Sequence, residues 1–145
     1  LKDWWTEEDA KNFEKRADVM VAFFDSIEVA PGVHANGRMT LGENIADHGG
    51  LQVSYQAFKK ATAAAPLEVK DGFTPEQRFF LAYANVWANN TRPEAILQLT
   101  KIDVHSLGKW RVDAALPHIA AWYDAFGITE KDPMYVPVEE RISIW

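Results

Sequence analysis

The 145-residue chain contains no cysteine, which excludes both disulfide bonds and thiolate metal sites. No apolar run approaches the roughly 18 to 20 residues that cross a bilayer, so the sequence predicts no membrane contact. Lysine and arginine number 15 against 21 acidic residues, for a net charge of -6 without a basic cluster. Nucleic acid is therefore not an expected partner. With 48% hydrophobic residues, the chain has enough apolar side chains for one buried core.

Helix start and stop signals dominate what is present. Thr6 is a candidate N-cap for a helix that ends near Ile27, since three acidic residues follow it directly. Thr74, with proline next and glutamine three positions later, fits a capping box that opens another helix. Shorter helices are expected over 92–99 and 116–126, the latter ending at Gly127, before an extended tail. These signals predict a mainly α, bundle-like domain over residues 1–145.

Turn signals follow the first helix. Pro31-Gly32 and the stronger Asn36-Gly37 pair predict a loop or a short hairpin near residues 29–39. Thr40, followed three residues later by Glu43, fits a capping box. We therefore expect a second helix to begin at Thr40 and to run to about Ala63.

The stretch LGENIADHGG in this second helix places two acids four residues apart. Glu43 and Asp47 share one helix face, where like charges repel. On an exposed helix this arrangement is an ordinary solvated acidic face. Here an apolar stripe continues beyond the acids, and Gly49 and Gly50 lower the helix propensity. Buried carboxylates need a cation or hydrogen-bond donors, and glycines admit a neighbouring helix, so the pattern favours a metal site shared with another helix.

The same residues resemble a known family. The stretch NGRMTLGENIADHGG is similar to the second zinc motif of the neprilysin and endothelin-converting-enzyme family of zinc metallopeptidases. The likeness extends through WANNTRPEAILQLTKIDVHSLGKWRV to the closing RISIW, and it begins with a DWW segment at residues 3–5. Animal members carry a cysteine where Ile142 stands, so a bacterial source is expected.

The resemblance implies a role for four residues. Glu43 matches the glutamate that ligates the catalytic zinc ion, and Asp47 matches the aspartate that orients a zinc-binding histidine. His105 matches the histidine that stabilises the oxyanion of the tetrahedral intermediate. Arg111 matches the arginine that binds a substrate carbonyl. Asp113 departs from the asparagine that is common at this position.

The remaining histidines do not complete a zinc site. The interpretation is structural for His48, and His34 and His118 are expected to be a loop and a helix histidine rather than ligands. No two histidines stand four residues apart, so the HExxH motif of these enzymes is absent. In the family that motif precedes the DWW segment, so it is expected upstream of residue 1.

The resemblance thus implies the C-terminal part of a peptidase catalytic domain. The expected partners are a peptide substrate and the rest of the peptidase chain, and the expected location is extracytoplasmic. The segment alone, without two ligands and the general base, is expected to be inactive and to bind zinc weakly. An alternative is a non-catalytic helical interaction domain that has lost the zinc chemistry. A di-iron bundle would need ExxH pairs on two helices, and the sequence has none.

Overall fold

The computed structural model describes residues 4–144, so Asp3 of the DWW segment and the final Trp145 lie outside the described residues. The chain is mainly α-helical, as predicted. Its elements, in chain order, are α1 (Glu7–Asp25), β1 (Glu28–Ala30), β2 (Val33–His34), α2 (Gly37–Thr62), α3 (Pro75–Val86), α4 (Pro93–Ile102), α5 (Gly108–Asp113), the 3-10 turn η1 (Leu116–His118), α6 (Ala120–Phe126) and the 3-10 turn η2 (Val138–Glu140).

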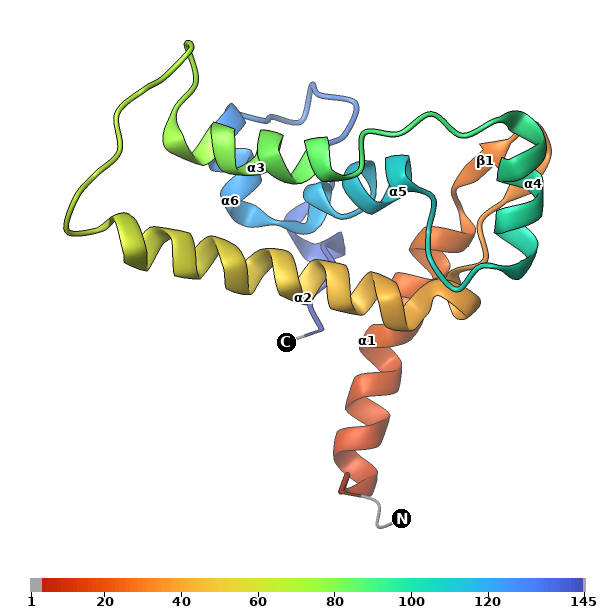
Figure 1. Cartoon of the computed structure of the whole chain (residues 1–145). Helices are drawn as coiled ribbons and strands as arrows, with labels where there is room; N and C mark the ends of the chain where they lie inside the picture. Colours follow the sequence, from red (N-terminus) through yellow and green to blue (C-terminus); the bar gives the residue numbers. More distant parts are fainter. Residues whose placement is uncertain (1–3, 145) are drawn as a thin grey trace.

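The long helix α2 forms the base on which the other elements are arranged (Figure 1). Helix α1 packs against the beginning of α2 and extends away from the body. Helix α3 runs alongside α2 and packs on α6. Helix α4 packs against β1 at the end of the molecule where α2 starts. In residues 4–144, no helix is both long enough and apolar enough to span a membrane.

Local hydrogen bonds confirm the predicted caps of α1, α3 and α6. The Thr6 hydroxyl accepts from the backbone N–H of Asp9 at 3.1 Å. Thr74 and Gln77 form the reciprocal capping box, with Pro75 at the first helical position. Gly127 ends α6 in the left-handed conformation at φ +63°, which glycine adopts without a steric penalty.

The predicted start of α2 at Thr40 is wrong. The helix begins at Gly37, and Asn36 is its N-cap, with the side-chain oxygen accepting from the N–H of Met39 at 2.9 Å. A Cβ atom on Gly37 would lie 2.3 Å from the carbonyl oxygen of Val21, so glycine is needed where α2 crosses α1. Thr40 lies one turn inside the helix and donates to the Asn36 carbonyl instead of capping.

The predicted hairpin is present, but its turn does not lie at Asn36-Gly37, the stronger of the two turn signals. Strands β1 and β2 pair antiparallel with Glu28 opposite His34. The chain reverses at Pro31-Gly32, where Gly32 has φ +71°, and not at Asn36-Gly37. Asn-Gly is a hairpin signal because both residues tolerate positive φ, but asparagine is equally a good N-cap. At this site the helix uses it as a cap.

Two further differences concern the C-terminal half. The single helix expected over 116–126 is divided at Ile119, whose extended backbone separates η1 from α6. Helix α5 has no side-chain cap and no prediction anticipated it.

The buried residues form two clusters. One joins α2, α3, η1 and α6, and the other joins α1 with the C-terminal segment. The buried members of the first are Leu51, Phe80, Leu116, Ile119, Trp122 and Tyr123, and those of the second are Met20, Phe24, Ala114, Ile142 and Ile144. Together they fix α2 relative to the segment 103–118, which carries the other candidate site residues.

Candidate metal and substrate site

Helix α2 presents two adjacent polar faces near its beginning. Thr40, Asn44 and His48 recur at four-residue spacing and are each no more than 5% exposed. Glu43 and Asp47 each stand one residue before Asn44 and His48, so they lie beside this buried face. The helix therefore holds both acids at the boundary between the core and solvent.

Asp47 is held by Arg111 of α5. The Nε and Nη2 atoms of Arg111 each donate to one carboxylate oxygen of Asp47 at 2.6 Å, a bidentate ion pair. The Asp47 side chain is 14% exposed and the Arg111 side chain is 12% exposed. The hydrogen bond to Asp47 raises the pKa of Arg111 above its ordinary value. Residues 64 positions apart in the chain are thus joined by a strong charge-assisted contact.

Two side chains of α3 and its C-cap support Arg111. The guanidinium carbon lies 3.8 Å from the centre of the Trp87 ring, a cation–π contact. The Tyr83 hydroxyl donates to the Arg111 carbonyl at 2.8 Å, and burial raises the pKa of Tyr83 to about 12. Sequence reasoning missed both residues, because nothing in the local pattern connects α3 with α5.

Glu43 and His105 meet at the more exposed edge of the site. His105 Nε2 lies 3.2 Å from Glu43 Oε2, and the two side chains are 45% and 41% exposed. Arg111 Nη2 is 3.9 Å from the same Glu43 oxygen. The other ring nitrogen of His105 contacts the Asp103 carboxylate at 2.8 Å. The His105 backbone N–H also donates to this carboxylate, and these bonds lower the pKa of Asp103.

The structure therefore brings together the four residues named from sequence. Without the HExxH segment, the face of α2 that carries Glu43, Asp47, Gly50 and Ser54 is expected to be open, and this holds for three of the four residues. Gly50 and Ser54 are exposed, and no described atom lies within 4 Å of a Cβ built on Gly50. It is wrong for Asp47, because Arg111 covers the carboxylate.

The other histidines lie away from this edge. His48 is 2% exposed and points into the core, where burial lowers its pKa. His118 is the last residue of the 3-10 helix η1, and its Nδ1 accepts from the N–H of Ile142 at 3.1 Å. His34 lies in β2 and is exposed, with its ring nitrogen 3.1 Å from the Asp25 carbonyl.

Comparison with known families agrees with the motif and the geometry. The family model described as "Peptidase family M13" matches residues 1–142 of the chain. The chain belongs to peptidase family M13.

Relatives in this family cover the whole chain. Human neprilysin is 36% identical over 150 aligned positions, and the neutral endopeptidase of Lactobacillus helveticus is 36% identical over 145. The inhibitor complex of the Mycobacterium tuberculosis zinc metalloprotease ZMP1 is 30% identical, with a TM-score of 0.94 and 100% coverage of this chain. The chain spans 20% of neprilysin, 21% of the endopeptidase and 23% of the ZMP1 chain, or about a fifth of each.

The donor set of this M13 chain fits a zinc ion only in part. Among residues 4–144, no three histidine, aspartate or glutamate side chains are grouped so that they could hold a metal ion. Glu43 offers an accessible carboxylate, whereas both oxygens of Asp47 already accept from Arg111. A catalytic zinc ion takes three protein ligands, so a zinc site at Glu43 would need at least two more from outside residues 4–144.

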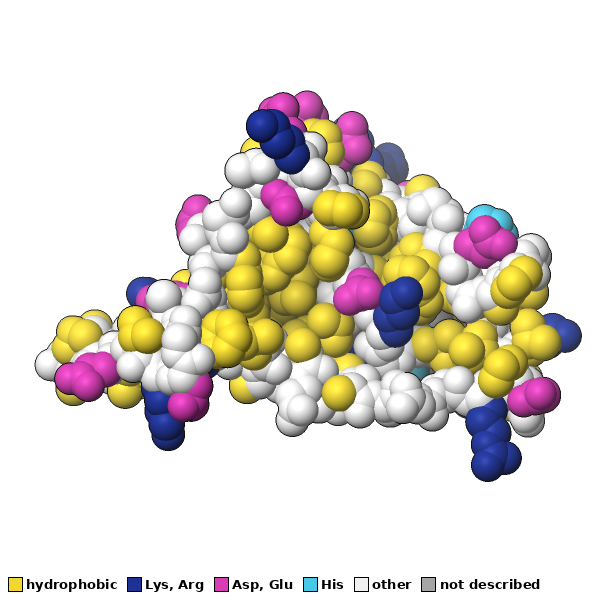
Figure 2. Space-filling model, turned by 90° about the horizontal axis from the view of Figure 1, so that it is seen from above, with side chains coloured by type: hydrophobic (Ala, Val, Ile, Leu, Met, Phe, Trp, Pro, Cys, Tyr) yellow, Lys and Arg dark blue, Asp and Glu magenta, His cyan; other side chains and the backbone are white. Residues whose placement is uncertain are grey.

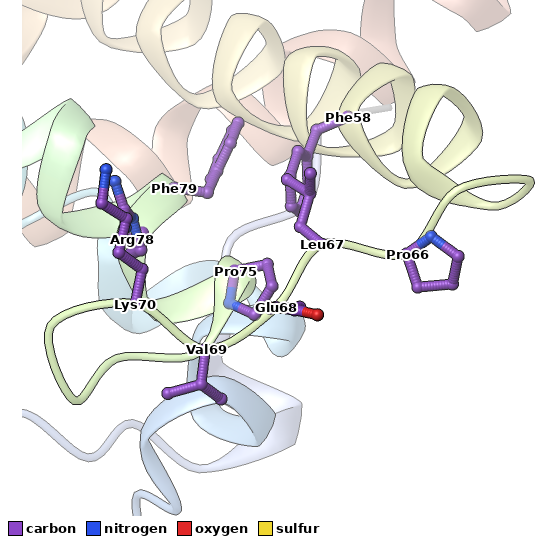
Figure 3. Close-up of a pocket in the computed structure, with 9 residues that line it drawn as sticks. All are labelled: Phe58, Pro66, Leu67, Glu68, Val69, Lys70, Pro75, Arg78 and Phe79. Carbon is purple, nitrogen blue, oxygen red and sulfur yellow. The ribbon is translucent and has the colours of Figure 1, made fainter.

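A pocket of about 660 Å³ lies elsewhere, between the end of α2 and the start of α3. Figure 3 shows Leu67 of the intervening loop pointing toward Phe58 of α2. Phe58 is about 22 Å from Glu43 along the helix, at roughly 1.5 Å per residue. This pocket is therefore separate from the site formed by Glu43, Asp47, His105 and Arg111.

Proposed function

We propose that the chain is the C-terminal part of the catalytic domain of a zinc-dependent metalloendopeptidase. The observation that carries this proposal is the meeting of Glu43 and Asp47 of α2 with His105 and Arg111, which are about 60 residues away in sequence. Membership of family M13, and the zinc metalloprotease named among its structural relatives, support the same chemistry.

In this proposal each residue has one task. Glu43 supplies one zinc ligand, and two histidines of an HExxH segment supply the others. Asp47, held rigid by Arg111, keeps acceptor capacity on its carboxylate to orient one of those histidines. When bound, zinc polarises the peptide carbonyl and lowers the pKa of its water to about 7. The general base that takes the proton of this water would come, like the two histidines, from the HExxH segment.

His105 and Arg111 act on the substrate. The His105 ring lies at the exposed edge beside Glu43, where it can donate to the oxygen that becomes negatively charged in the transition state. Arg111 uses two of its five N–H groups on Asp47, which leaves three for a substrate carbonyl. The peptide substrate therefore binds along the edge formed by Glu43, His105 and Arg111.

The rest of the peptidase chain is the proposed partner of the exposed apolar surface. Several large apolar side chains are more than half exposed, among them Val53, Val86 and Ile102. Figure 2 shows apolar side chains gathered over a broad area of the face seen from above. Exposed apolar areas of this kind mark interaction surfaces. An extracytoplasmic location is part of the same proposal.

The zinc content of the full-length protein tests the proposal. We expect Glu43→Ala to remove or greatly weaken zinc binding, because two histidines and solvent remain as ligands. Asp47→Ala should lower metal affinity or activity by about 10- to 100-fold, because it removes an orienting contact and not a zinc ligand. Glu14→Ala, on an exposed position of α1, is the matched control and should keep its zinc.

Atomic absorption of purified proteins gives the answer. Equal zinc in Glu43→Ala and wild type would refute the ligand assignment. A full-length wild-type protein without zinc or peptidase activity would favour the alternative, a non-catalytic interaction domain. An Asp47→Ala protein as damaged as Glu43→Ala would show that the two roles are assigned wrongly.

A further inference from the structure

A hydrogen-bond chain centred on the buried Asn44 connects α2 with the segment that carries His105. The Ser106 hydroxyl donates to Asn44 Oδ1 at 2.7 Å, and Asn44 Nδ2 donates to the Thr40 hydroxyl at 2.9 Å. Thr40 in turn donates to the Asn36 carbonyl at 3.0 Å. Asn44 is only 4% exposed, so water does not compete well for these bonds. Ser106 Oγ, Asn44 Nδ2 and Thr40 Oγ1 each have an acceptor, and satisfied partners are the condition for a stabilising polar network.

Two members of this hydrogen-bond chain directly follow site residues in the sequence. Asn44 follows Glu43 on α2, and Ser106 follows His105 in the connection between α4 and α5. Two contacts thus join the same two segments: Glu43 with His105 at 3.2 Å, and Asn44 with Ser106 at 2.7 Å. The side chains of Glu43 and His105 are each more than 40% exposed. Exposed ion pairs contribute little to stability and are screened by salt.

The other contacts of residues 103–111 do not set the distance between His105 and Glu43. The bonds from His105 to Asp103 lie within the segment, so they shape it without attaching it to α2. The Arg111–Asp47 pair does attach it, but five residues after Ser106 and beyond the start of α5. Gly108, two residues after Ser106, lies close to Asn89 and the Trp87 carbonyl, but those residues belong to the end of α3 and the loop after it, not to α2.

We propose that Asn44 is a positioning residue that places His105 beside Glu43 by accepting the hydrogen bond of Ser106. Its catalytic meaning rests on the proposed function, in which His105 stabilises the oxyanion. An oxyanion donor works only if it is aimed at the developing charge, and a displacement of 1 Å can cost about 100-fold in rate. Removal of the Ser106 hydroxyl therefore affects turnover without touching the substrate.

Steady-state kinetics of the full-length peptidase test this role. We expect Ser106→Ala to lower kcat about 10-fold with KM and zinc content unchanged, less than the roughly 100- to 1,000-fold loss of a whole donor. Ser106→Thr keeps a hydroxyl and should restore kcat. Ser26→Ala is the control, since the Ser26 hydroxyl also donates one hydrogen bond, in this case to the Phe23 carbonyl, but lies at the end of α1, away from the site.

A double-mutant comparison separates positioning from general damage. If Asn44 and Ser106 act through one bond, Asn44→Ala with Ser106→Ala should lose no more than about the larger single loss in kcat. Losses that multiply, an unchanged kcat in Ser106→Ala, or an equal loss in Ser26→Ala would each overturn the inference.

A measurement on the 145-residue chain needs neither zinc nor activity. Proton NMR should show nuclear Overhauser contacts between the His105 ring and the Glu43 methylene protons in wild type and Ser26→Ala. These contacts should be lost in Ser106→Ala and return in Ser106→Thr. If they persist in Ser106→Ala, the positioning role is refuted. If they behave as expected while the full-length wild type hydrolyses no peptide, the proposed function fails and the structural role of Asn44 stands.

Discussion

Replacement of Asp47 by alanine should destabilise the chain markedly. The change leaves the Arg111 guanidinium without the two bonds of 2.6 Å that it now makes, at a site where its side chain is 12% exposed. Breaking a fully buried ion pair costs about 3–5 kcal/mol, and a hydrogen bond to a charged group contributes about 1.5–3 kcal/mol. Because some solvent reaches the pair, we expect a loss of about 2–3 kcal/mol in the free energy of unfolding.

Calorimetry and urea titration followed by circular dichroism measure this loss. With an unfolding entropy of about 2.1 cal/mol/K per residue, a chain of 145 residues loses about 0.3 kcal/mol per degree near its Tm. The expected fall in Tm is therefore about 7–10 °C. The midpoint of the urea transition should move while its slope stays constant.

The chain contains a matched control. Arg38 and Asp18 form an ion pair of the same residue types, but their side chains are 64% and 62% exposed. Asp18→Ala should therefore cost less than about 1 kcal/mol. The double variant Asp47→Ala with Arg111→Met should recover at least about 1 kcal/mol relative to the sum of the single losses, because no charge is left unpaired. Equal losses in Asp18→Ala and Asp47→Ala, or strictly additive effects, would refute the reasoning.

Three further predictions concern pH, turnover and the isolated chain. Burial lowers the pKa of His118 to about 4, so the folded chain binds fewer protons than the unfolded chain, and stability should fall as the pH drops from about 6.5 to 4, by up to about 1.4 kcal/mol per pH unit. Urea titrations at pH 7 and 5 should show a smaller fall in His118→Gln, whereas the exposed His34→Gln should follow the wild type; identical profiles in all three would contradict this. In the full-length protein, His105→Leu should lower kcat at normal zinc content, whereas Arg111→Met should also raise KM, and loss of zinc in either variant would require a different geometry. The 145-residue chain with added zinc should hydrolyse no peptide, and stoichiometric nanomolar binding in calorimetric titration would show a more complete site than the one described.

The helix caps could be predicted from sequence because their hydrogen bonds lie within one helical turn. Thr6 bonds three residues ahead, and so does Thr74 with Gln77, so residue types at fixed spacing identify these caps. The start of α2 shows the limit of such reasoning. Thr40 and Glu43 have the right spacing, but the close approach of Gly37 to Val21 of α1 lets the helix begin one turn earlier. That approach depends on packing, which the local pattern does not contain.

In the candidate site, too, the sequence indicated the residues but not their tertiary contacts. Residue types and spacing indicated the acids of α2, and the resemblance added His105 and Arg111 with their roles. Neither indicated that Asp47 is paired with Arg111, that Trp87 stacks on the guanidinium, or that Asn44 holds Ser106. Each of these contacts joins segments that are more than 20 residues apart.

The sequence by itself determined the helical class, most of the caps, the turn-rich connection after α1 and the family motif. Each of these depends on interactions within about four residues, or on the order of residues along the chain. The tertiary structure alone decided where α2 begins, which acid is covered and which remains open, and what holds the segment 103–111 against α2. Those outcomes depend on burial, which lowers competition from water and makes one long-range polar contact stronger than another of the same chemistry.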